Sequence, residues 1–365
     1  MPRPTLAWLH IGDLHLTTAG EPNHRDLQRI VALANALPQG ALDFAFLPGD
    51  CAEDGPPAQF QLVRDTLSLH LPLHITPGDH DFKQRPLAGF YATLGIPPLP
   101  YAITLQHTRC LFLDLVSAGA GGPDFRLGDA QLDWAEREAD AAAGQAVALF
   151  MHTYPADLRA GRDRLLRLLA RPNVLCVDMG HTHYNELAND GSTVFMATRS
   201  TGQVEEGPPG FSIAAIDAGG ISWRFKPCTQ PWPFTLITHP TDRRLAIRAD
   251  PAASRQSTVR AKIVGDAPVR TVELQADDGP WSPMTPVSGA TLLWEAPCAG
   301  PASTLRVRAR DAQGREDTDQ IELAGPDWVP TPRAADGSDR DRLEAWPEKG
   351  LLGTQLGPNR RGRKW

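Results

Sequence analysis

The first part of the chain alternates between short apolar runs and longer amphipathic stretches. The apolar runs have the length of buried β-strands, and they cover residues 6–11, 44–47, 73–75, 146–151 and 174–177. Between them, residues 25–37 and 129–142 repeat apolar side chains at helical spacing along one face. Strands that alternate with helices predict an α/β layered fold.

A polar motif follows each of these apolar runs. The motifs are Asp13-Leu14-His15, Gly49-Asp50, Gly78-Asp79-His80-Asp81, His152 and Gly180-His181-Thr182-His183. Because functional sites in open α/β sheets lie beyond the carboxyl ends of the strands, we expect these side chains to meet. On an extended segment, Asp13 and His15 point to the same side and can chelate one ion. We expect His181 and His183 to repeat that geometry.

The residue types in these motifs predict the chemistry of the site. Carboxylates combined with imidazoles suit Zn, Mn or Fe better than Mg or Ca. An isolated histidine is more often packed or hydrogen-bonded than a metal ligand. The ordered set, with each member after a predicted strand, instead indicates a two-metal hydrolytic site. Such a site suits phosphoester hydrolysis, because paired ions generate a hydroxide nucleophile and neutralise the attacking and leaving oxygens.

The order of the motifs resembles the DxH, GD, GNH[D/E], H and GHxH signature of calcineurin-like metallophosphoesterases, over residues 5–225. The resemblance implies an αββα sandwich, in which two sheets are flanked by helices. It also implies one metal ion held by Asp13, His15, Asp50 and His183, and a second held by Asp50, Asp79, His152 and His181. Asp50 would bridge the two ions. His80 would be the catalytic general acid or phosphate-binding histidine, oriented by Asp81.

Asp79 departs from the family pattern, which has asparagine at this position. With Asp13 and Asp50 it supplies three negative charges, and a bridging hydroxide supplies a fourth, so two divalent ions would be fully neutralised. A trivalent ion beside a divalent one would restore a positive charge that attracts phosphate. We therefore hypothesise that the site prefers Fe or Mn, with Zn as the other candidate. The alternative is that Asp79 ligates through one oxygen with little consequence.

Other polar residues near the motifs carry weaker expectations. His24 follows the first ligand strand and is a candidate substrate-binding residue, although Asn23 or Asp26 capping the next helix would make it incidental. Arg199 is a second substrate-binding candidate, because its guanidinium can grip phosphate with two hydrogen bonds. A structural ion pair explains it equally well. Glu53, in an acidic turn after Asp50, can line the cleft, but acidic turn residues are more often solvated or cap the next helix, which is the role we expect.

Composition limits the class of protein. The chain has 365 residues, of which 41% are hydrophobic, so it can form two or three domains with real cores. The net charge of −7 argues against a nucleic-acid binder. The sequence contains no run long and apolar enough to span a membrane, and its first strand leaves no room for a signal peptide. The five scattered cysteines suit reduced thiols, so we expect a cytoplasmic protein.

The pattern changes after a proline-rich linker at residues 227–233. Short runs beyond it alternate with a period of two, which predicts an antiparallel β-sandwich. This part looks like an immunoglobulin or fibronectin type III module, and it can serve as a spacer, a wall of the cleft or a homo-oligomerisation surface. We therefore divide the chain into a catalytic domain at residues 1–230, a sandwich at 231–325 and a tail at 326–365.

The tail is rich in Pro, Gly and Arg but also holds large apolar residues, namely Trp328, Trp346, Leu351, Leu352, Leu356 and Trp365. A disordered tail rarely carries so many, so we expect part of it to dock on the folded body. The basic residues at 359–364 can meet an acidic surface or a substrate phosphate. A freely solvated basic terminus is the alternative.

The combined reading favours a phosphodiesterase that acts on a small organic phosphate ester, with metal-bound hydroxide attacking phosphorus and His80 assisting the leaving group. The motifs are similar to those of bacterial cyclic-nucleotide and glycerophosphodiester phosphodiesterases. The alternatives within the same chemistry are a phosphomonoesterase or a nuclease. An alternative of another class is a non-catalytic, metal-dependent scaffold for protein binding.

Overall fold

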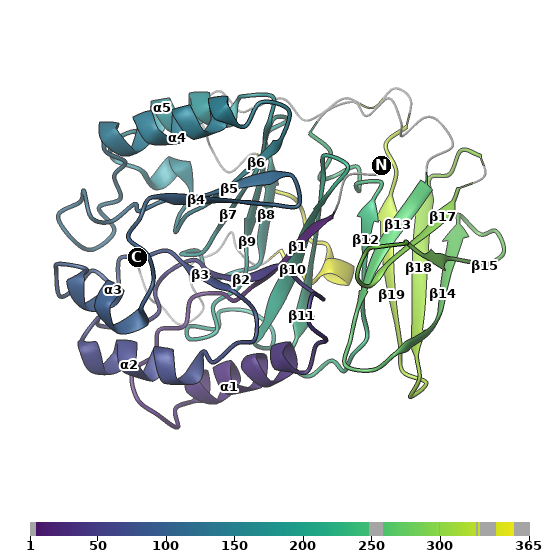
Figure 1. The fold of residues 1–365 in the computed structure, drawn as a ribbon, viewed down its shortest axis with the longest axis horizontal. Coiled ribbons are helices and arrows are strands. Elements are labelled where there is room, and N and C mark those ends of the chain that lie inside the picture. The colour runs from purple at the N-terminus through teal and green to yellow at the C-terminus, as the bar shows by residue number, and fades with distance from the viewer. Residues whose placement is uncertain (1–4, 248–257, 299, 326–327, 329–340, 354–365) are drawn as a thin grey trace.

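Two β-sheets pack face to face in the N-terminal part of the protein (Figure 1). The computed structural model describes residues 5–247, 258–298, 300–325, 328 and 341–353. The first sheet has the order β11-β10-β1-β2-β3, with β1 at Leu6–His10, β2 at Phe44–Leu47, β3 at Leu73–Ile75, β10 at Gly210–Asp217 and β11 at Gly220–Pro227. Strands β1, β2 and β3 are parallel, so their carboxyl ends meet at one edge.

The second sheet has the order β4-β5-β6-β7-β9-β8. Its strands are β4 at Tyr101–Leu105, β5 at Thr108–Phe112, β6 at Ala146–Phe150, β7 at Val174–Met179, β8 at Glu186–Asn189 and β9 at Val194–Ala197. The central strands β5, β6, β7 and β9 are parallel, and β4 and β8 are antiparallel edges. The carboxyl ends of β6 and β7 therefore also share one edge.

Alternating side chains of the strands fill two different layers. One face of each sheet points to the other sheet, and that layer is aromatic, with Trp8, Phe44, Phe46, Phe112 and Phe150 packed together. The ring centroids of Phe46 and Phe150 lie 4.9 Å apart in an edge-to-face arrangement. The opposite faces are covered by helices.

Helices α1 (Pro22–Asn35), α2 (Pro57–Thr66) and α3 (Ala88–Leu94) lie on the side of the first sheet, and α4 (Asp129–Ala141) and α5 (Arg162–Leu169) lie on the side of the second (Figure 1). A short 3₁₀ helix, η1 (Pro155–Asp157), precedes α5. Helices α1 and α4 correspond to the two amphipathic stretches of the sequence. The predicted αββα layering is confirmed.

A buried polar cluster links the two sheets. Asp178 on β7 lies 2.6 Å from His10 Nδ1, and Trp8 Nε1 donates to its other carboxylate oxygen, also at 2.6 Å. Both Trp8 and His10 belong to β1, and all three side chains are fully buried. The cluster therefore fixes β1 against β7. His10 lies three residues before Asp13, and Asp178 lies three residues before His181.

The chain beyond β11 forms a second pair of sheets, all antiparallel. One sheet has the order β12-β13-β17-β16, with β12 at Phe234–His239, β13 at Thr258–Val264, β17 at Leu293–Pro297 and β16 at Thr285–Pro286. The other has the order β15-β14-β18-β19, with β15 at Ser282–Pro283, β14 at Val269–Ala276, β18 at Thr304–Asp311 and β19 at Glu316–Glu322. Ile237, Ile263, Leu274, Val307 and Ile321 share the core between them. The predicted β-sandwich is confirmed.

Buried ion pairs join the sandwich to the first part of the chain. Arg224 on β11 binds the Asp317 carboxylate of β19 through two nitrogens, at 2.6 and 3.0 Å. The backbone N–H of Thr235 donates to the same carboxylate at 2.7 Å. Because both charged groups are buried and doubly bonded, this contact fixes the relative position of the two sheets that carry them.

A C-terminal segment packs across both parts. It contains the 3₁₀ helix η3 (Pro347–Lys349), and Trp346 and Leu351 are buried in the aromatic layer between the first two sheets. Lys349 Nζ lies 2.5 Å from Asp319 of the sandwich. The predicted boundaries at residues 230 and 325 stay predictions, and Leu356, Trp365 and the basic residues 359–364 lie outside the described residues. No helix of the described part is long and apolar enough to cross a membrane.

Candidate metal centre

The motif residues all lie on loops that leave strand ends, at the edge where the two sheets meet. Asp13 and His15 follow β1, Asp50 follows β2, and Asp79 follows β3. From the second sheet, His152 follows β6, and His181 and His183 follow β7. The structure therefore brings all seven predicted metal ligands to one place, as the positions of the apolar runs predict.

The first ligand group consists of Asp13, His15, Asp50 and His183, whose ligand atoms lie within 4.8 Å of one another. The Nε2 atoms of His15 and His183 are 3.0 Å apart, and His183 Nε2 is 3.6 Å from Asp13 Oδ2. All four residues are buried. This set of two imidazoles and two carboxylates fits a divalent transition metal.

The second ligand group consists of Asp50, Asp79, His152 and His181, again within 4.8 Å. His152 Nε2 lies 3.6 Å from Asp50 Oδ2 and 3.4 Å from Asp79 Oδ1. His181 Nδ1 lies 3.5 Å from the same Asp79 oxygen. Asp50 belongs to both groups, so one carboxylate faces both candidate ion positions.

Several polar atoms of the two groups fit a metal better than a protein partner. Asp13 Oδ1, Asp79 Oδ1 and His152 Nε2 are buried and make no hydrogen bond within the described part of the chain. Such atoms are costly unless something binds them. His152 is oriented for this role, because its other nitrogen lies 2.9 Å from the Pro48 carbonyl.

The pKa values of the site reflect a concentration of buried negative charge. Burial raises the pKa of Asp50 well above its ordinary value. Burial lowers the pKa of His152, but the charge of Asp50 and the contact with Asp79 outweigh it and raise that pKa to about 10. A buried site that attracts protons so strongly also attracts metal cations, which replace them.

Two glycines let the loops approach one another. A Cβ atom at Gly78 would collide with the Asp50 carboxylate, and one at Gly180 would collide with the Asp13 carboxylate. Glycine at each position is required by close approach, since any side chain would push a ligand out of place. The glycines of the GDHD and GHTH motifs are therefore needed so that the ligand loops can pack closely, and not only to form turns.

The paired histidine motifs are not extended, which corrects one prediction. His15, Asp50, His181 and His183 all have a left-handed backbone, with φ of 45°, 48°, 67° and 65°. This conformation is rare for residues other than glycine and is typical of functional loops. As a result, His181 and His183 do not chelate one ion together. His183 lies in the first group and His181 in the second.

His80 lies beside the first group, but Asp81 does not orient it as predicted. The Asp81 carboxylate is buried and accepts the backbone N–H groups of Ala52 and Gly78, each at 3.0 Å. His80 Nδ1 instead lies 2.8 Å from the Glu53 carbonyl and 3.4 Å from the Glu53 carboxylate. The prediction that Asp81 orients His80 is therefore wrong. Asp81 instead holds the loops that carry the ligands, and Glu53 contacts the histidine.

Glu53 contacts the site, although a solvated or helix-capping role was expected for it. Its carboxylate lies 3.0 Å from His15 Nδ1 and accepts the Gln203 amide at 3.0 Å. Burial lowers the pKa of His80, but the bond to Glu53 and the charges of Asp50 and Asp79 together outweigh it and raise that pKa to about 9. The only signal in the sequence was its place three residues after Asp50, which is equally common for a solvated turn.

The two predicted substrate-binding residues do not reach the site. The His24 ring is buried on α1 and accepts the backbone N–H of Gly20 at 3.0 Å. The Arg199 guanidinium is buried, donates to the carbonyls of Glu206 and Gly350, and stacks on Phe225. Burial lowers the pKa of Arg199 to about 10. Both predictions are corrected, since these side chains face the interior.

Asn23 does not cap α1 either. Its amide nitrogen donates to the carbonyls of Leu14 and His15, at 3.1 and 2.8 Å. The helix begins after Glu21 and makes no side-chain cap at its first turn. Asn23 therefore holds the loop that carries His15 instead of satisfying the helix.

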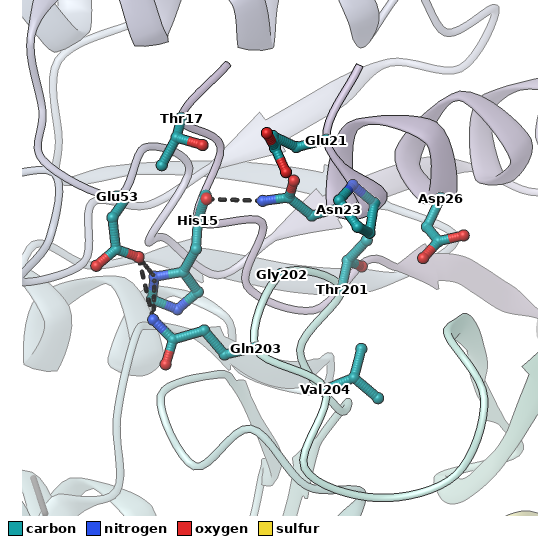
Figure 2. Close-up of a pocket in the computed structure, with 11 residues that line it drawn as sticks. His15, Thr17, Glu21, Asn23, Asp26, Glu53, Thr201, Gly202, Gln203 and Val204 are labelled. Carbon is teal, nitrogen blue, oxygen red and sulfur yellow. Dashed lines mark hydrogen bonds and ion pairs between the residues drawn. The ribbon is translucent and has the colours of Figure 1, made fainter. Parts of the chain in front are cut away.

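A cavity of about 480 Å³ opens beside the first ligand group (Figure 2). Its wall is formed by the loop after β1 with the start of α1, the turn that contains Glu53, and the loop after β9. The lining residues are His15, Thr17, Glu21, Pro22, Asn23, Asp26, Glu53, Thr201, Gly202, Gln203 and Val204. Its volume suits a small organic ligand.

Comparisons with known proteins agree with this geometry. Residues 8–185 match the family model for calcineurin-like phosphoesterases. A probable cyclic nucleotide phosphodiesterase of Synechococcus sp. is 28% identical over 239 residues, which is 60% of this chain and 91% of the relative. A dimetal phosphatase from Danio rerio has the same fold, with a TM-score of 0.51 at 14% identity, over 62% of this chain and 98% of that one. The similarity to calcineurin-like phosphoesterases therefore extends over residues 8–185 of this chain.

Proposed function

We propose that this protein is a dinuclear metal phosphodiesterase that hydrolyses a small organic phosphate ester. The observation that carries the proposal is the shared position of Asp50, whose carboxylate belongs to both ligand groups. A shared carboxylate supports two ions held side by side. Similarity to a probable cyclic nucleotide phosphodiesterase supports a diester over a monoester.

The chain's own residues can supply the remaining chemistry. Two ions bound in these groups would activate water and offset the negative charge on phosphate. His80 is held by its backbone N–H to Asp50 Oδ1 at 2.9 Å and by its ring to Glu53. Contact with Glu53 and the charges of Asp50 and Asp79 favour the protonated form of the ring against the effect of burial. The protonated ring can then donate a proton to the leaving oxygen.

Hydrolysis of matched chromogenic esters tests the proposed reaction. With Mn, Fe, Zn or Co, we expect bis(p-nitrophenyl) phosphate to be hydrolysed at least tenfold faster, in kcat/KM, than p-nitrophenyl phosphate. His80→Ala should lower kcat by roughly 10²- to 10⁴-fold, the usual contribution of a general acid. His70→Ala, which removes an exposed histidine, is the matched control and should keep full activity. Turnover of the monoester alone, or of neither ester with any of the four metals, would contradict the proposal.

We further infer that the site prefers Fe or Mn. Asp79 Oδ1 faces both His152 and His181, which supports a charged oxygen ligand where the family has a neutral amide. Glu53, in contact with His15, adds a fourth carboxylate near the first group. This density of negative charge favours a trivalent ion beside a divalent one.

Elemental analysis of protein purified without added metal tests this preference. The native chain should contain iron, alone or with manganese or zinc, and Asp79→Asn should shift the content towards zinc, because it removes one negative charge from the second group. Electron paramagnetic resonance of the native protein would identify a mixed-valence pair. Zinc alone or manganese alone at both positions of the native protein would rule out the mixed-valence hypothesis.

The remaining assignments are also proposals. We assign the sandwich an immunoglobulin or fibronectin type III-like type, which two packed antiparallel sheets support. The ion pair between Arg224 and Asp317 supports a bracing role for it. The five cysteines are free thiols, and four of them are buried, which supports a reducing compartment such as the cytoplasm.

A further inference from the structure

The loop after β9, residues 198–209, holds the backbone of two ligands of the first group. Ser200 Oγ and the backbone N–H groups of Thr201 and Gly202 all donate to the Asp13 carbonyl, at 2.8, 2.9 and 3.0 Å. The backbone N–H of Ser200 also donates to the His183 carbonyl, at 3.2 Å. Two ligands that are distant in the sequence are thus held by the same short stretch of chain.

This loop packs directly on the segment that carries Asp13. A Cβ atom at Gly12 would lie 2.0 Å from the Arg199 carbonyl oxygen. One at Gly202 would lie 2.0 Å from the Leu14 carbonyl oxygen. The backbone on both sides of Asp13 is therefore in close contact with the loop. Because a packed interior transmits displacements, a shift of the loop moves the ligand.

The buried guanidinium of Arg199 fixes the position of the loop. Its Nη1 donates to the carbonyls of Glu206 and Pro208, at 3.0 and 3.2 Å, and so closes the loop on itself. Its Nη2 donates to the carbonyl of Gly350 in the C-terminal segment, at 2.9 Å. Arg199 is only 2% exposed, so water cannot replace a lost carbonyl without opening the interior.

Asn185 joins the same carbonyl to the other ligand loop. It stands two residues after His183, and its amide nitrogen donates to the Gly350 carbonyl at 2.8 Å. Its amide oxygen accepts the backbone N–H of Arg199, also at 2.8 Å. One carbonyl of the C-terminal segment therefore connects the loop after β7 with the loop after β9.

The position of this carbonyl is itself closely determined. The backbones of Trp346 and Leu351 exchange two hydrogen bonds, at 2.7 and 3.1 Å, and both side chains are buried. Gly350 has a left-handed backbone with φ of 88°, and a Cβ atom there would lie 2.7 Å from Phe225 Cβ. The Phe225 ring also stacks on Arg199. Only glycine fits this seat, so any larger residue would displace the carbonyl.

We propose that the C-terminal segment, residues 341–353, is a positioning element of the metal centre, and that the Gly350 carbonyl sets the metal affinity of the first ligand group. The inference rests on the two-ion centre of the proposed function, but not on the identity of the ester. The second group has a separate support, since His152 bonds to the Pro48 carbonyl. The segment therefore governs the first ion more than the second.

Calorimetric titration of the metal-free chain with Mn²⁺ tests this selectivity. Gly350→Ala should weaken one of the two binding steps by roughly 10- to 100-fold, the usual effect of losing an interaction that orients a ligand, and leave the other within about twofold. His183→Ala and His152→Ala identify the steps, because each removes a ligand of one group. The step weakened by Gly350→Ala should be the one that His183→Ala abolishes.

A glycine of the sandwich provides the matched control. Gly289 also has a left-handed backbone, with φ of 76°, but no atom lies within 4 Å of an added Cβ. Gly289→Ala should leave both binding steps unchanged. Arg199→Lys is a second, milder variant, since it keeps the charge but replaces the planar fork by a single ammonium group. It should weaken the same step as Gly350→Ala.

Hydrogen exchange of the metal-free protein measures the positioning without metal or turnover. The amides of Thr201 and Gly202, which bond to Asp13, should exchange at least about tenfold faster in Gly350→Ala, because local opening becomes easier. The amide of Leu149 in the centre of β6 should keep its rate. A general loss of stability would instead accelerate all three.

The outcomes separate the two proposals. Equal weakening of both steps in Gly350→Ala and Arg199→Lys, or no weakening in either variant, would overturn the positioning role and leave the phosphodiesterase proposal intact. If the native chain bound no metal, the phosphodiesterase proposal would fail. The exchange rates of Thr201 and Gly202 would still decide whether the C-terminal segment holds the loop.

Discussion

Replacing Asp50 with asparagine is expected to remove metal binding from both ligand groups and to lower kcat/KM by about 10³-fold or more, since both ions depend on one charge. The Asp50 carboxylate lies 3.7 Å from His15 Nε2 in the first group and 3.6 Å from His152 Nε2 in the second. An amide keeps the shape of the side chain but loses the negative charge. Calorimetric metal titration and elemental analysis measure the two sites directly.

Asp54→Asn is the matched control for this experiment. Asp54 lies four residues further along the chain, and its side chain is 56% exposed, so the same chemical change there should leave metal content and activity unaltered. A variant Asp50→Asn that still retained two tightly bound metal ions per chain would refute the bridging role. Loss of only one ion would place Asp50 in a single ligand group.

Replacing Asp178 with alanine should destabilise the fold by about 3–5 kcal/mol, the usual cost of removing one partner from a buried pair. The carboxylate bonds both His10 and Trp8 at 2.6 Å, so its loss leaves two polar groups buried without an acceptor. Because the cluster joins the two sheets, the variant should also bind metal more weakly. Equilibrium unfolding in urea measures the stability, and metal titration measures the second effect.

A double variant and a surface control complete this test. If the loss of stability arises because His10 is left buried without its carboxylate partner, His10→Phe should recover part of the stability lost in Asp178→Ala. A double-mutant cycle would show this recovery. Asp65→Ala, on the exposed face of α2, should change the free energy of unfolding by about 0.5 kcal/mol or less. An effect of Asp178→Ala no larger than that of Asp65→Ala would show that the cluster does not join the sheets energetically.

The positions of the ligands were predictable from the sequence because each is tied to a strand end. The run at residues 44–47 coincides with β2, and that at 73–75 coincides with β3. The length of a run and the motif after it are local properties of the chain. The sharing of Asp50 between two groups was implied by the family resemblance, and the atoms of the structure lie where that sharing requires.

The partners of the side chains were not predictable, because the tertiary structure decides them. Arg199 was as suitable for a phosphate as for a structural ion pair, and the fold places its guanidinium 3.7 Å from the Glu206 carboxylate and 2.9 Å from the Gly350 carbonyl. Asp81 stands next to His80 in the sequence, but its carboxylate turns to backbone N–H groups of neighbouring loops. Glu53 carries no motif, and its contact with His15 exists only because two loops meet.

The cavity beside the first ligand group illustrates the same limit. Its carboxylates come from the start of α1 and from the turn after β2, while Thr201 and Gln203 come from a loop far along the chain. No short pattern unites them. The sandwich was predictable from its period of two, whereas the path of the C-terminal segment depends on where Trp346 and Leu351 find apolar surface.

The bonds to Gly350 impose an order on the biogenesis of the protein. Arg199 and Asn185 reach its carbonyl at 2.9 and 2.8 Å, and Gly350 is translated 151 residues after Arg199. Asn185 also accepts the backbone N–H of Arg199, next to the loop that lines the cavity. A ribosome-bound chain that has already exposed every metal ligand therefore still lacks these bonds. We expect the nascent centre to gain its final rigidity only after Gly350 has left the ribosome.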